Sequence, residues 1–190
     1  MKSRNAPLLI LALIGGLSAC ASSSSDKVAI EAGAMAAGDE MPMPMPTAEH
    51  KEILSSVGMW EGTMTAYMPG APAEPIAARE TVTAIGGFWT QARFECDFMG
   101  MPYVGTGAFG FDPERGKYVG TWIDSMGSYL AVMEGEKNSA GNVVMRWNAP
   151  DMTGKIVEHR NESVRSANAY TMTFYTGDTK SMVISMKRKR

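Results

Sequence analysis

Residues 58–187 repeat a pattern in which apolar and polar side chains alternate and short turn-forming segments interrupt them. The clearest case is 88–98, where Phe94, Cys96 and Phe98 lie between polar or charged residues. A period of two is typical of a strand that buries one face. Short links between such runs predict neighbouring antiparallel strands, so this pattern limits the possible folds more than any other feature.

Nine such runs follow one another, or ten if 76–85 is included. They are 60–66, 76–85, 88–98, 103–111, 117–125, 129–136, 143–148, 155–164, 170–176 and 181–187. A short helix is predicted before them, capped by Thr47 and ended by Gly58. This order favours an all-β, antiparallel up-and-down barrel of nine to ten strands, because closure removes exposed edges. A two-sheet sandwich is the alternative.

Glycines inside the predicted strands fit the sharp coiling or bulges of a small barrel. They are residues 62, 105, 107, 110, 120 and 135.

The first 19 residues have the features of a signal peptide. A basic start is followed by the apolar run 6–14, which is too short to span a bilayer as a helix. The sequence Leu-Ser-Ala-Cys at 17–20 resembles the bacterial lipobox. This resemblance implies cleavage before Cys20 and lipidation of its thiol and new amine. Since more than one acyl chain gives stable anchoring, a membrane is the expected partner.

Residues 20–46 are predicted to form a lipidated, flexible tether ahead of the barrel domain at 47–190. They contain a serine run, an Ala/Gly-rich stretch and the Met-Pro repeats of 41–46, and no aromatic residue precedes Trp60. A segment without large side chains buries too little surface to offset its ordering entropy. The methionines could instead bind Cu(I), but an extended proline-rich backbone points them in different directions, which favours a spacer.

The residue after Cys20 is Ala21 rather than the Asp that acts as an inner-membrane retention signal. The expected location is therefore the bacterial cell envelope, at the outer membrane facing the periplasm. The formal net charge is −2, whereas nucleic-acid binders usually carry a basic face, so no nucleic-acid partner is expected. Two cysteines and two histidines are too few for a disulfide scaffold or most multi-histidine metal sites.

Six segments of the chain carry a family resemblance. They are 58–62, 86–88, 98–103, 107–112, 118–127 and 151–155. Together they resemble the bacterial domain-of-unknown-function family 1579 over about residues 47–187, and Trp-Ile-Asp-Ser-Met-Gly at 122–127 is a fairly specific part. The resemblance implies a calycin-like barrel and supplies no catalytic residues.

The segment Gly58-x-Trp60 after a short helix is similar to the lipocalin motif, in which the tryptophan plugs the closed end of the barrel. With Gly62 it also resembles the opening of nitrobindins, which bind haem. Met64 stands where a third glycine is expected, and residues 160–190 lack the axial histidine. A haem-binding barrel is therefore the least favoured alternative, and the cofactor is left unknown.

The expected function is non-enzymatic binding or carriage of a small apolar ligand, because methionine-rich, aromatic-lined interiors adapt to varied apolar molecules. The alternative is a structural or interaction module at the membrane, with unknown protein partners. Residues predicted to point inward are Met64, Phe94, Phe109, Trp122, Met145, Trp147, Met172 and Phe174. The predicted ligand-binding residues are Phe94, Phe109, Trp122, Asp124 and Trp147.

Asp124 shares a strand face with Trp122. It could orient a ligand at the barrel mouth, or it could accept hydrogen bonds from the turn at 126–127, which is the favoured interpretation. Cys96, the thiol left after lipidation, is predicted to be a buried, unreactive side chain.

Ser125 would need a nearby histidine to act as a hydrolase nucleophile. His50 and His159 are both predicted to face solvent, so this interpretation is disfavoured. The basic residues 187–190 are predicted to form a solvated, frayed end.

Overall fold

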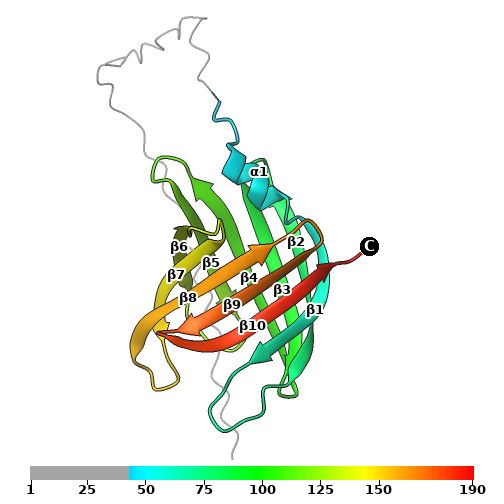
Figure 1. The fold of residues 1–190 in the computed structure, drawn as a ribbon, viewed down its shortest axis with the longest axis vertical. Helices are drawn as coiled ribbons and strands as arrows, with labels where there is room; N and C mark the ends of the chain where they lie inside the picture. The colour runs from blue at the N-terminus through cyan, green and yellow to red at the C-terminus, as the bar shows by residue number, and fades with distance from the viewer. Residues whose placement is uncertain (1–42) are drawn as a thin grey trace, which may run out of the picture. The chain divides into compact units, whose positions relative to one another are not determined.

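The computed structural model describes residues 43–190, so the predicted signal peptide, Cys20 and most of the tether lie outside the described residues. Within 43–190, one helix precedes ten antiparallel strands (Figure 1). The elements are α1 (Ala48–Leu54), β1 (Gly58–Ala66), β2 (Pro75–Ile85), β3 (Trp89–Phe98), β4 (Met101–Asp112), β5 (Lys117–Asp124), β6 (Ala131–Lys137), β7 (Val143–Pro150), β8 (Ile156–Arg165), β9 (Ala169–Thr176) and β10 (Thr179–Arg188). No helix of this described part is long and apolar enough to cross a membrane.

The sheet closes on itself because its first and last strands pair. β1 and β10 run antiparallel, with Trp60 opposite Arg188 and Ala66 opposite Met182. Every other strand pairs with its neighbours in sequence. The prediction of an all-β, up-and-down barrel is confirmed, and the two-sheet alternative is excluded.

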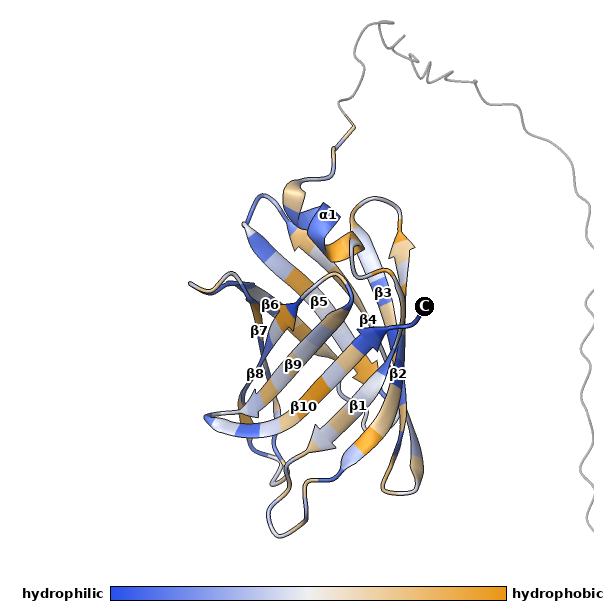
Figure 2. Ribbon diagram, turned by 45° about the vertical axis from the view of Figure 1, so that its right-hand side comes forward, coloured by the Kyte–Doolittle hydropathy of each residue, from blue (hydrophilic) through white to orange (hydrophobic). Residues whose placement is uncertain are grey.

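The predicted alternation is present in the strands. In β3, Thr90, Ala92 and Phe94 are buried, and the residues between them are exposed. Figure 2 shows hydropathy changing from one residue to the next along several strands. The apolar phase forms the interior of the barrel, as a half-buried strand requires.

Helix α1 covers one end of the barrel (Figure 1). Its residue Ile53 packs against the cluster that contains Tyr118 of β5. The indole Nε1 of Trp60 donates a hydrogen bond to the Ser56 carbonyl oxygen at 2.9 Å, and Trp60 is 1% exposed. The tryptophan thus occupies the position of a plug. Three residues separate the end of the helix at Leu54 from the start of β1 at Gly58, so Gly58 does not end the helix as predicted.

His50 is buried, so the prediction that it faces solvent is wrong. The Thr47 N–H donates to His50 Nδ1 at 3.0 Å, and His50 Nε2 lies 3.0 Å from the Phe111 carbonyl oxygen. The tautomer with its proton on Nε2 satisfies both contacts. The imidazole therefore takes the place that Glu usually has in a capping box, and it ties α1 to β4.

Strand β10 extends to Arg188, so it includes part of the segment 187–190 that was predicted to be frayed. The Arg188 guanidinium lies 4.2 Å from the centroid of the Trp60 ring. Gly58 leaves room for it, since a Cβ there would lie 2.5 Å from Arg188 Nη1, and its φ of +144° suits glycine. The guanidinium donates to the carbonyl oxygens of Val57 and Ser55 at 2.7 Å each and of Ala167 at 3.1 Å.

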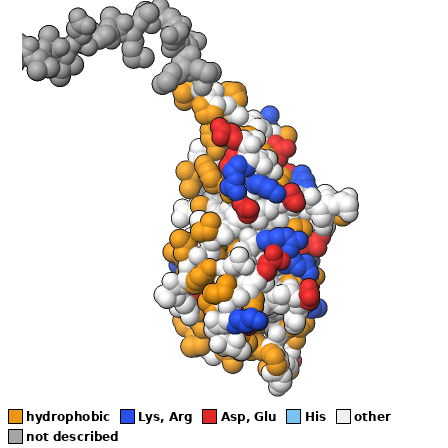
Figure 3. Space-filling view, turned by 90° about the vertical axis from the view of Figure 1, so that its left-hand side faces the viewer, with side chains coloured by type: hydrophobic (Ala, Val, Ile, Leu, Met, Phe, Trp, Pro, Cys, Tyr) orange, Lys and Arg blue, Asp and Glu red, His pale blue; other side chains and the backbone are white. Residues whose placement is uncertain are grey.

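The outer face of the barrel carries ion pairs between neighbouring strands. Figure 3 shows basic and acidic side chains next to each other on one side of the molecule. Such pairs join Lys117 to Glu136 at 2.9 Å and Arg146 to Glu158 at 3.0 Å. Exposed pairs contribute little to stability, so they mark the solvent face rather than hold the fold together.

Candidate functional site

The barrel encloses a cavity of about 690 Å³. All eight residues predicted to point inward line it, and so do all five predicted ligand-binding residues. The structure thus brings Phe94, Phe109, Trp122, Asp124 and Trp147 around one space. Its volume lies within the roughly 300–1,000 Å³ range typical of small-molecule pockets.

One wall of the cavity is formed by aromatic rings that lie flat on β4 and β5. The Trp122 ring covers Gly105 and Gly107, and a Cβ at Gly105 would lie 2.3 Å from Trp122 Cζ2. Phe109 covers Gly120 in the same way, with 2.5 Å between a Cβ there and Phe109 Cδ1. The strand glycines therefore do more than permit coiling, because they let large rings sit against the backbone and leave the cavity open.

Another wall is formed by β8 and is polar. His159, Asn161 and Ser163 all line the cavity, and Asn161 is 5% exposed. Among residues 43–190, His159 Nε2 and Ser163 Oγ are buried without a hydrogen-bond partner. The prediction that this face is solvent-exposed is wrong.

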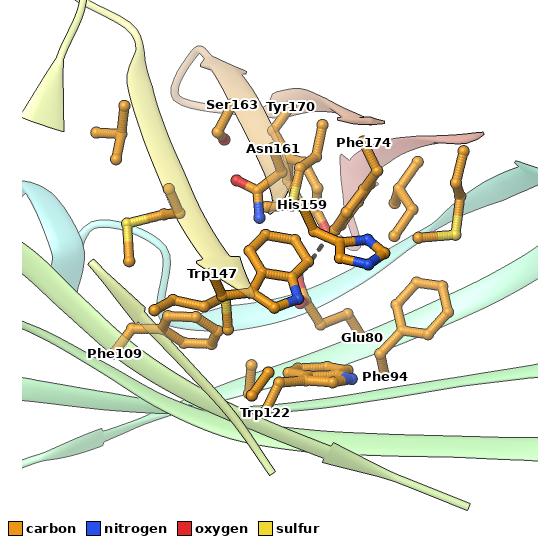
Figure 4. Close-up of a pocket in the computed structure, with 18 of the residues that line it drawn as sticks. Glu80, Phe94, Phe109, Trp122, Trp147, His159, Asn161, Ser163, Tyr170 and Phe174 are labelled. Carbon is orange, nitrogen blue, oxygen red and sulfur yellow. Dashed lines mark hydrogen bonds between the residues drawn. The ribbon is translucent and has the colours of Figure 1, made fainter. Parts of the chain in front are cut away.

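His159 is held by an aromatic neighbour across the strand pair (Figure 4). Its ring stacks on Trp147, with 5.6 Å between centroids and 17° between planes. Its Nδ1 lies 3.3 Å from Thr176 Oγ1, which leaves Nε2 facing the cavity. The sequence held a signal for this placement, because Trp147 was predicted inward and pairs directly with His159. Opposed residues of an antiparallel pair share a face.

A half-buried acid, Glu80, also lines the cavity. The Tyr170 hydroxyl donates to Glu80 Oε2 at 2.7 Å. Burial raises the pKa of Glu80, and the Tyr170 hydrogen bond and the Arg165 charge offset this only in part. Burial and the Glu80 charge together raise the pKa of Tyr170 well above its usual range. Sequence reasoning missed Glu80, although it lies in the same phase of its strand as Ala78 and Val82.

Asp124 lines the cavity where β5 ends, at the end of the barrel opposite α1. Its Oδ1 accepts the Met126 N–H at 2.8 Å, the hydrogen bond that the turn interpretation requires. Nearby, Trp122 Nε1 donates to the Tyr103 hydroxyl at 3.3 Å, and burial raises the pKa of Tyr103. A role for Asp124 in orienting a ligand stays a prediction.

The remaining candidates make structural contacts. Ser125 Oγ accepts the Val104 N–H at 3.1 Å, and no hydrogen bond within 43–190 joins Ser125 to a histidine. Cys96 is half-buried against the main apolar cluster, and burial raises the pKa of its thiol. In the described part of the chain, no three or more His, Cys, Asp or Glu side chains are grouped to hold a metal ion.

Comparisons with known proteins identify a family and similar solved structures. A family model described as a protein of unknown function (DUF1579) matches residues 45–189. No curated protein matches the chain significantly. A redesigned β-barrel bound to DFHBI is 12% identical, with a TM-score of 0.38 over 70% of this chain and 99% of that one. A second redesigned β-barrel is 12% identical, with a TM-score of 0.39 over 77% of this chain and 100% of that one.

Proposed function

The chain belongs to the DUF1579 family, whose function is unknown, and we propose from its interior that it binds or carries a small, largely apolar ligand without catalysing a reaction. The observation that carries this proposal is the cavity of about 690 Å³ inside the barrel. A barrel that served only as a scaffold would gain stability by filling this space with side chains.

The composition of the cavity wall supports the same proposal. Aromatic and methionine side chains offer a large, adaptable apolar surface. Two buried polar atoms without a protein partner, His159 Nε2 and Ser163 Oγ, add hydrogen-bonding positions. Each such atom costs about 1–3 kcal/mol when unpaired, so a ligand or water that pairs with it is stabilised. Mostly apolar walls with a few placed polar groups are typical of ligand sites.

The test is binding of N-phenyl-1-naphthylamine, an uncharged fluorescent probe, to the purified protein. We expect a saturable rise in fluorescence, and native mass spectrometry of protein from its own cells should show a bound ligand. Gly105→Ala should weaken probe binding several-fold, because the new Cβ pushes the Trp122 ring into the cavity. Val132→Ala is the control, because that side chain is 67% exposed and does not line the cavity. No probe binding and no co-purifying ligand would contradict the proposal.

The proposed location is the outer membrane of a bacterial envelope, on the periplasmic side. Support comes from the lipobox-like sequence at 17–20 and from Ala21 after it. Replacing Cys20 with Ser should leave the protein unlipidated and move it from the membrane fraction to the soluble fraction. Unchanged partitioning with membranes would exclude the anchor.

One observation favours the interaction module as a second candidate. The turns at the end opposite α1 expose large apolar side chains: Met99 is 68% exposed, Leu130 is 52% exposed and Met152 is 87% exposed. A photo-crosslinking residue in place of Leu130 in intact cells should trap one protein if this candidate is correct. Together with the absence of any bound ligand, that result would replace carriage as the proposed function.

The haem alternative gains one supporting contact, because His159 Nε2 faces the cavity without a partner among the described residues. Purified protein that carried haem would show a Soret band, and His159→Ala would remove it. We expect no such band.

A further inference from the structure

The cavity is bordered by one face of the Trp122 ring. This side chain points into the barrel and is only half-buried, because the cavity lies against it. One side of the ring lies on the backbone of β4, where a Cβ at Gly105 would come within 2.3 Å of it and a Cβ at Gly107 within 2.8 Å. Figure 4 shows the ring nearly edge-on, along the strands beside it. The other side of the ring is therefore left to the cavity.

No aromatic ring of residues 43–190 stacks on this open side. Trp122 forms one aromatic pair, a tilted contact with Phe109 that has 6.4 Å between centroids and 40° between planes. Trp147 also lines the cavity, but His159 is already stacked on its ring with 17° between planes. The face of Trp122 is thus the one that remains available for stacking.

The orientation of the Trp122 ring is fixed by the protein alone. Its Nε1 donates to the Tyr103 hydroxyl at 3.3 Å, and the β4 glycines behind it hold its other side close to the backbone. Phe109 lies over Gly120 in the same way and borders the ring. A surface that is rigid before binding loses little conformational entropy, and this favours a ligand that is itself flat and rigid.

Hydrogen-bonding groups lie across the interior from this ring. Strand β8 is three strands from β5 and four strands from β4 around the ten-strand barrel, so its inward side chains face these two strands rather than adjoin them. On β8, His159 Nε2 and Ser163 Oγ are buried and have no partner among the described residues. A ring face on one side and unpaired polar atoms on the other are two contacts that a single ligand can make.

On the basis of the function proposed above, we infer that the barrel takes flat aromatic ring systems that carry a hydroxyl or another hydrogen-bonding group at one edge. The ring stacks on the open face of Trp122, and the edge group pairs with His159 Nε2 or Ser163 Oγ. Offset stacking of aromatic rings adds binding free energy beyond that of the apolar area they bury. A saturated ring lacks this contribution, and a flexible acyl chain also loses rotational freedom on binding.

The first experiment compares 2-naphthalenemethanol with decahydro-2-naphthalenemethanol, its saturated counterpart with the same carbon number and hydroxyl group. Both are used to displace N-phenyl-1-naphthylamine, whose own dissociation constant is measured for each variant. The aromatic alcohol should bind the parent protein about 3- to 10-fold more tightly than the saturated one. Trp122→Leu keeps an apolar side chain and removes the ring, so this ratio should fall toward one.

Trp89→Leu is the matched control. The Trp89 ring also lies over a glycine of β4, since a Cβ at Gly110 would come within 2.3 Å of it, but this ring is 41% exposed and does not line the cavity. Its ratio should equal that of the parent. Melting temperatures well above the assay temperature verify that both variants are folded, and the ratio in the parent protein does not depend on any variant.

The second experiment tests the edge group. 2-Ethylnaphthalene has the shape of 2-naphthalenemethanol, with a methyl group in place of the hydroxyl. In a variant that carries both His159→Phe and Ser163→Ala, the alcohol should lose several-fold in affinity relative to 2-ethylnaphthalene, because its hydroxyl has lost both partners. The phenylalanine ring can still stack on Trp147, which keeps the wall in place.

Each result has a distinct meaning. If the saturated alcohol binds the parent as tightly as the aromatic alcohol, this inference is wrong and the proposed function stands. A ratio that Trp122→Leu leaves unchanged also overturns it, and so does a double variant that treats the alcohol and 2-ethylnaphthalene as the parent does. If neither the probe nor any of the three compounds binds, the proposed function fails and this inference fails with it.

Discussion

The helix-capped end of the barrel and the β8 wall differ in whether their polar side chains have hydrogen-bond partners. At the capped end, Trp60, His50 and Arg188 all donate to or accept from backbone groups at hydrogen-bond distance. On β8, His159 Nε2 and Ser163 Oγ are buried without a partner among the described residues. The contrast separates a region whose polar groups are satisfied within the fold from one whose hydrogen-bonding capacity is left unused by the described residues.

The largest effect should come from the capped end. Trp60→Ala removes a side chain that is 1% exposed and leaves a cavity beside Tyr170, so unfolding free energy should fall by about 3–5 kcal/mol. Urea denaturation followed by circular dichroism measures this loss. Trp89→Ala is the control, because that ring is 41% exposed on the outer face. Equal losses in the two variants would show that the capped end has no special role.

Arg188→Met should produce the next largest effect. The methionine keeps part of the apolar contact with Trp60 but removes the donors to three backbone carbonyls. The expected loss is about 1–3 kcal/mol of unfolding free energy. Arg190→Met at the exposed end of the chain serves as the control and should change nothing. A loss no larger than that of Arg190→Met would mean that the guanidinium contacts do not hold the two chain ends together.

A smaller effect, with a defined sign, is expected at Glu80. Its folded-state pKa is raised mainly by burial, so the folded protein binds this proton more tightly than the unfolded chain. The contribution of Glu80 to the free energy of unfolding is therefore fully present below its unfolded-state pKa of about 4.3. This contribution is lost as pH rises through the folded-state pKa. Glu80→Gln removes the titration, so its stability should exceed that of the parent increasingly above about pH 4.3. Thermal unfolding of both proteins from pH 4 to pH 8 tests this, and a constant difference would contradict it.

The smallest effect on stability should come from the β8 wall. Ser163→Ala removes a hydroxyl that has no partner to lose, so unfolding free energy should change by less than about 0.5 kcal/mol. Tyr170→Phe removes a hydroxyl that donates to Glu80 and should cost more, which makes it the matched comparison. If Ser163→Ala lowers the unfolding free energy as much as Tyr170→Phe does, the Ser163 hydroxyl has a structural partner. The contrast between the two regions would then be wrong.

The sequence predicted the architecture well because alternation reports one property, namely which residues share a face. It placed Phe94, Trp122 and Trp147 inside correctly, and the reason is clearest for Phe94, whose strand has the polar residues 91, 93 and 95 in the opposite phase. It failed for His159 because both phases of β8 are polar: Glu158, Arg160 and Glu162 alternate with His159, Asn161 and Ser163. Hydropathy cannot decide which phase is inside when neither is apolar, and only the pairing with Trp147 decides it.

Single residues in unusual roles were the other source of error. His50 was predicted to be exposed from its position on the short opening helix, yet it serves as the capping partner of Thr47. The inward position of Glu80 is difficult to predict from the sequence, because it is a single acid among the apolar residues that share its face of β2. The rings over Gly105 and Gly120 depend on neighbouring strands, which local sequence does not specify.

The pairing of β1 with β10 has a consequence for how the chain folds. The two strands meet with Trp60 opposite Arg188, so the contact that closes the barrel joins residues from opposite ends of the domain. Long loops must close before such a contact forms, and this slows folding. Until β10 is available, a partly folded chain exposes strand edges that can pair with other chains. Truncation of the last strand should therefore yield aggregates rather than a smaller barrel.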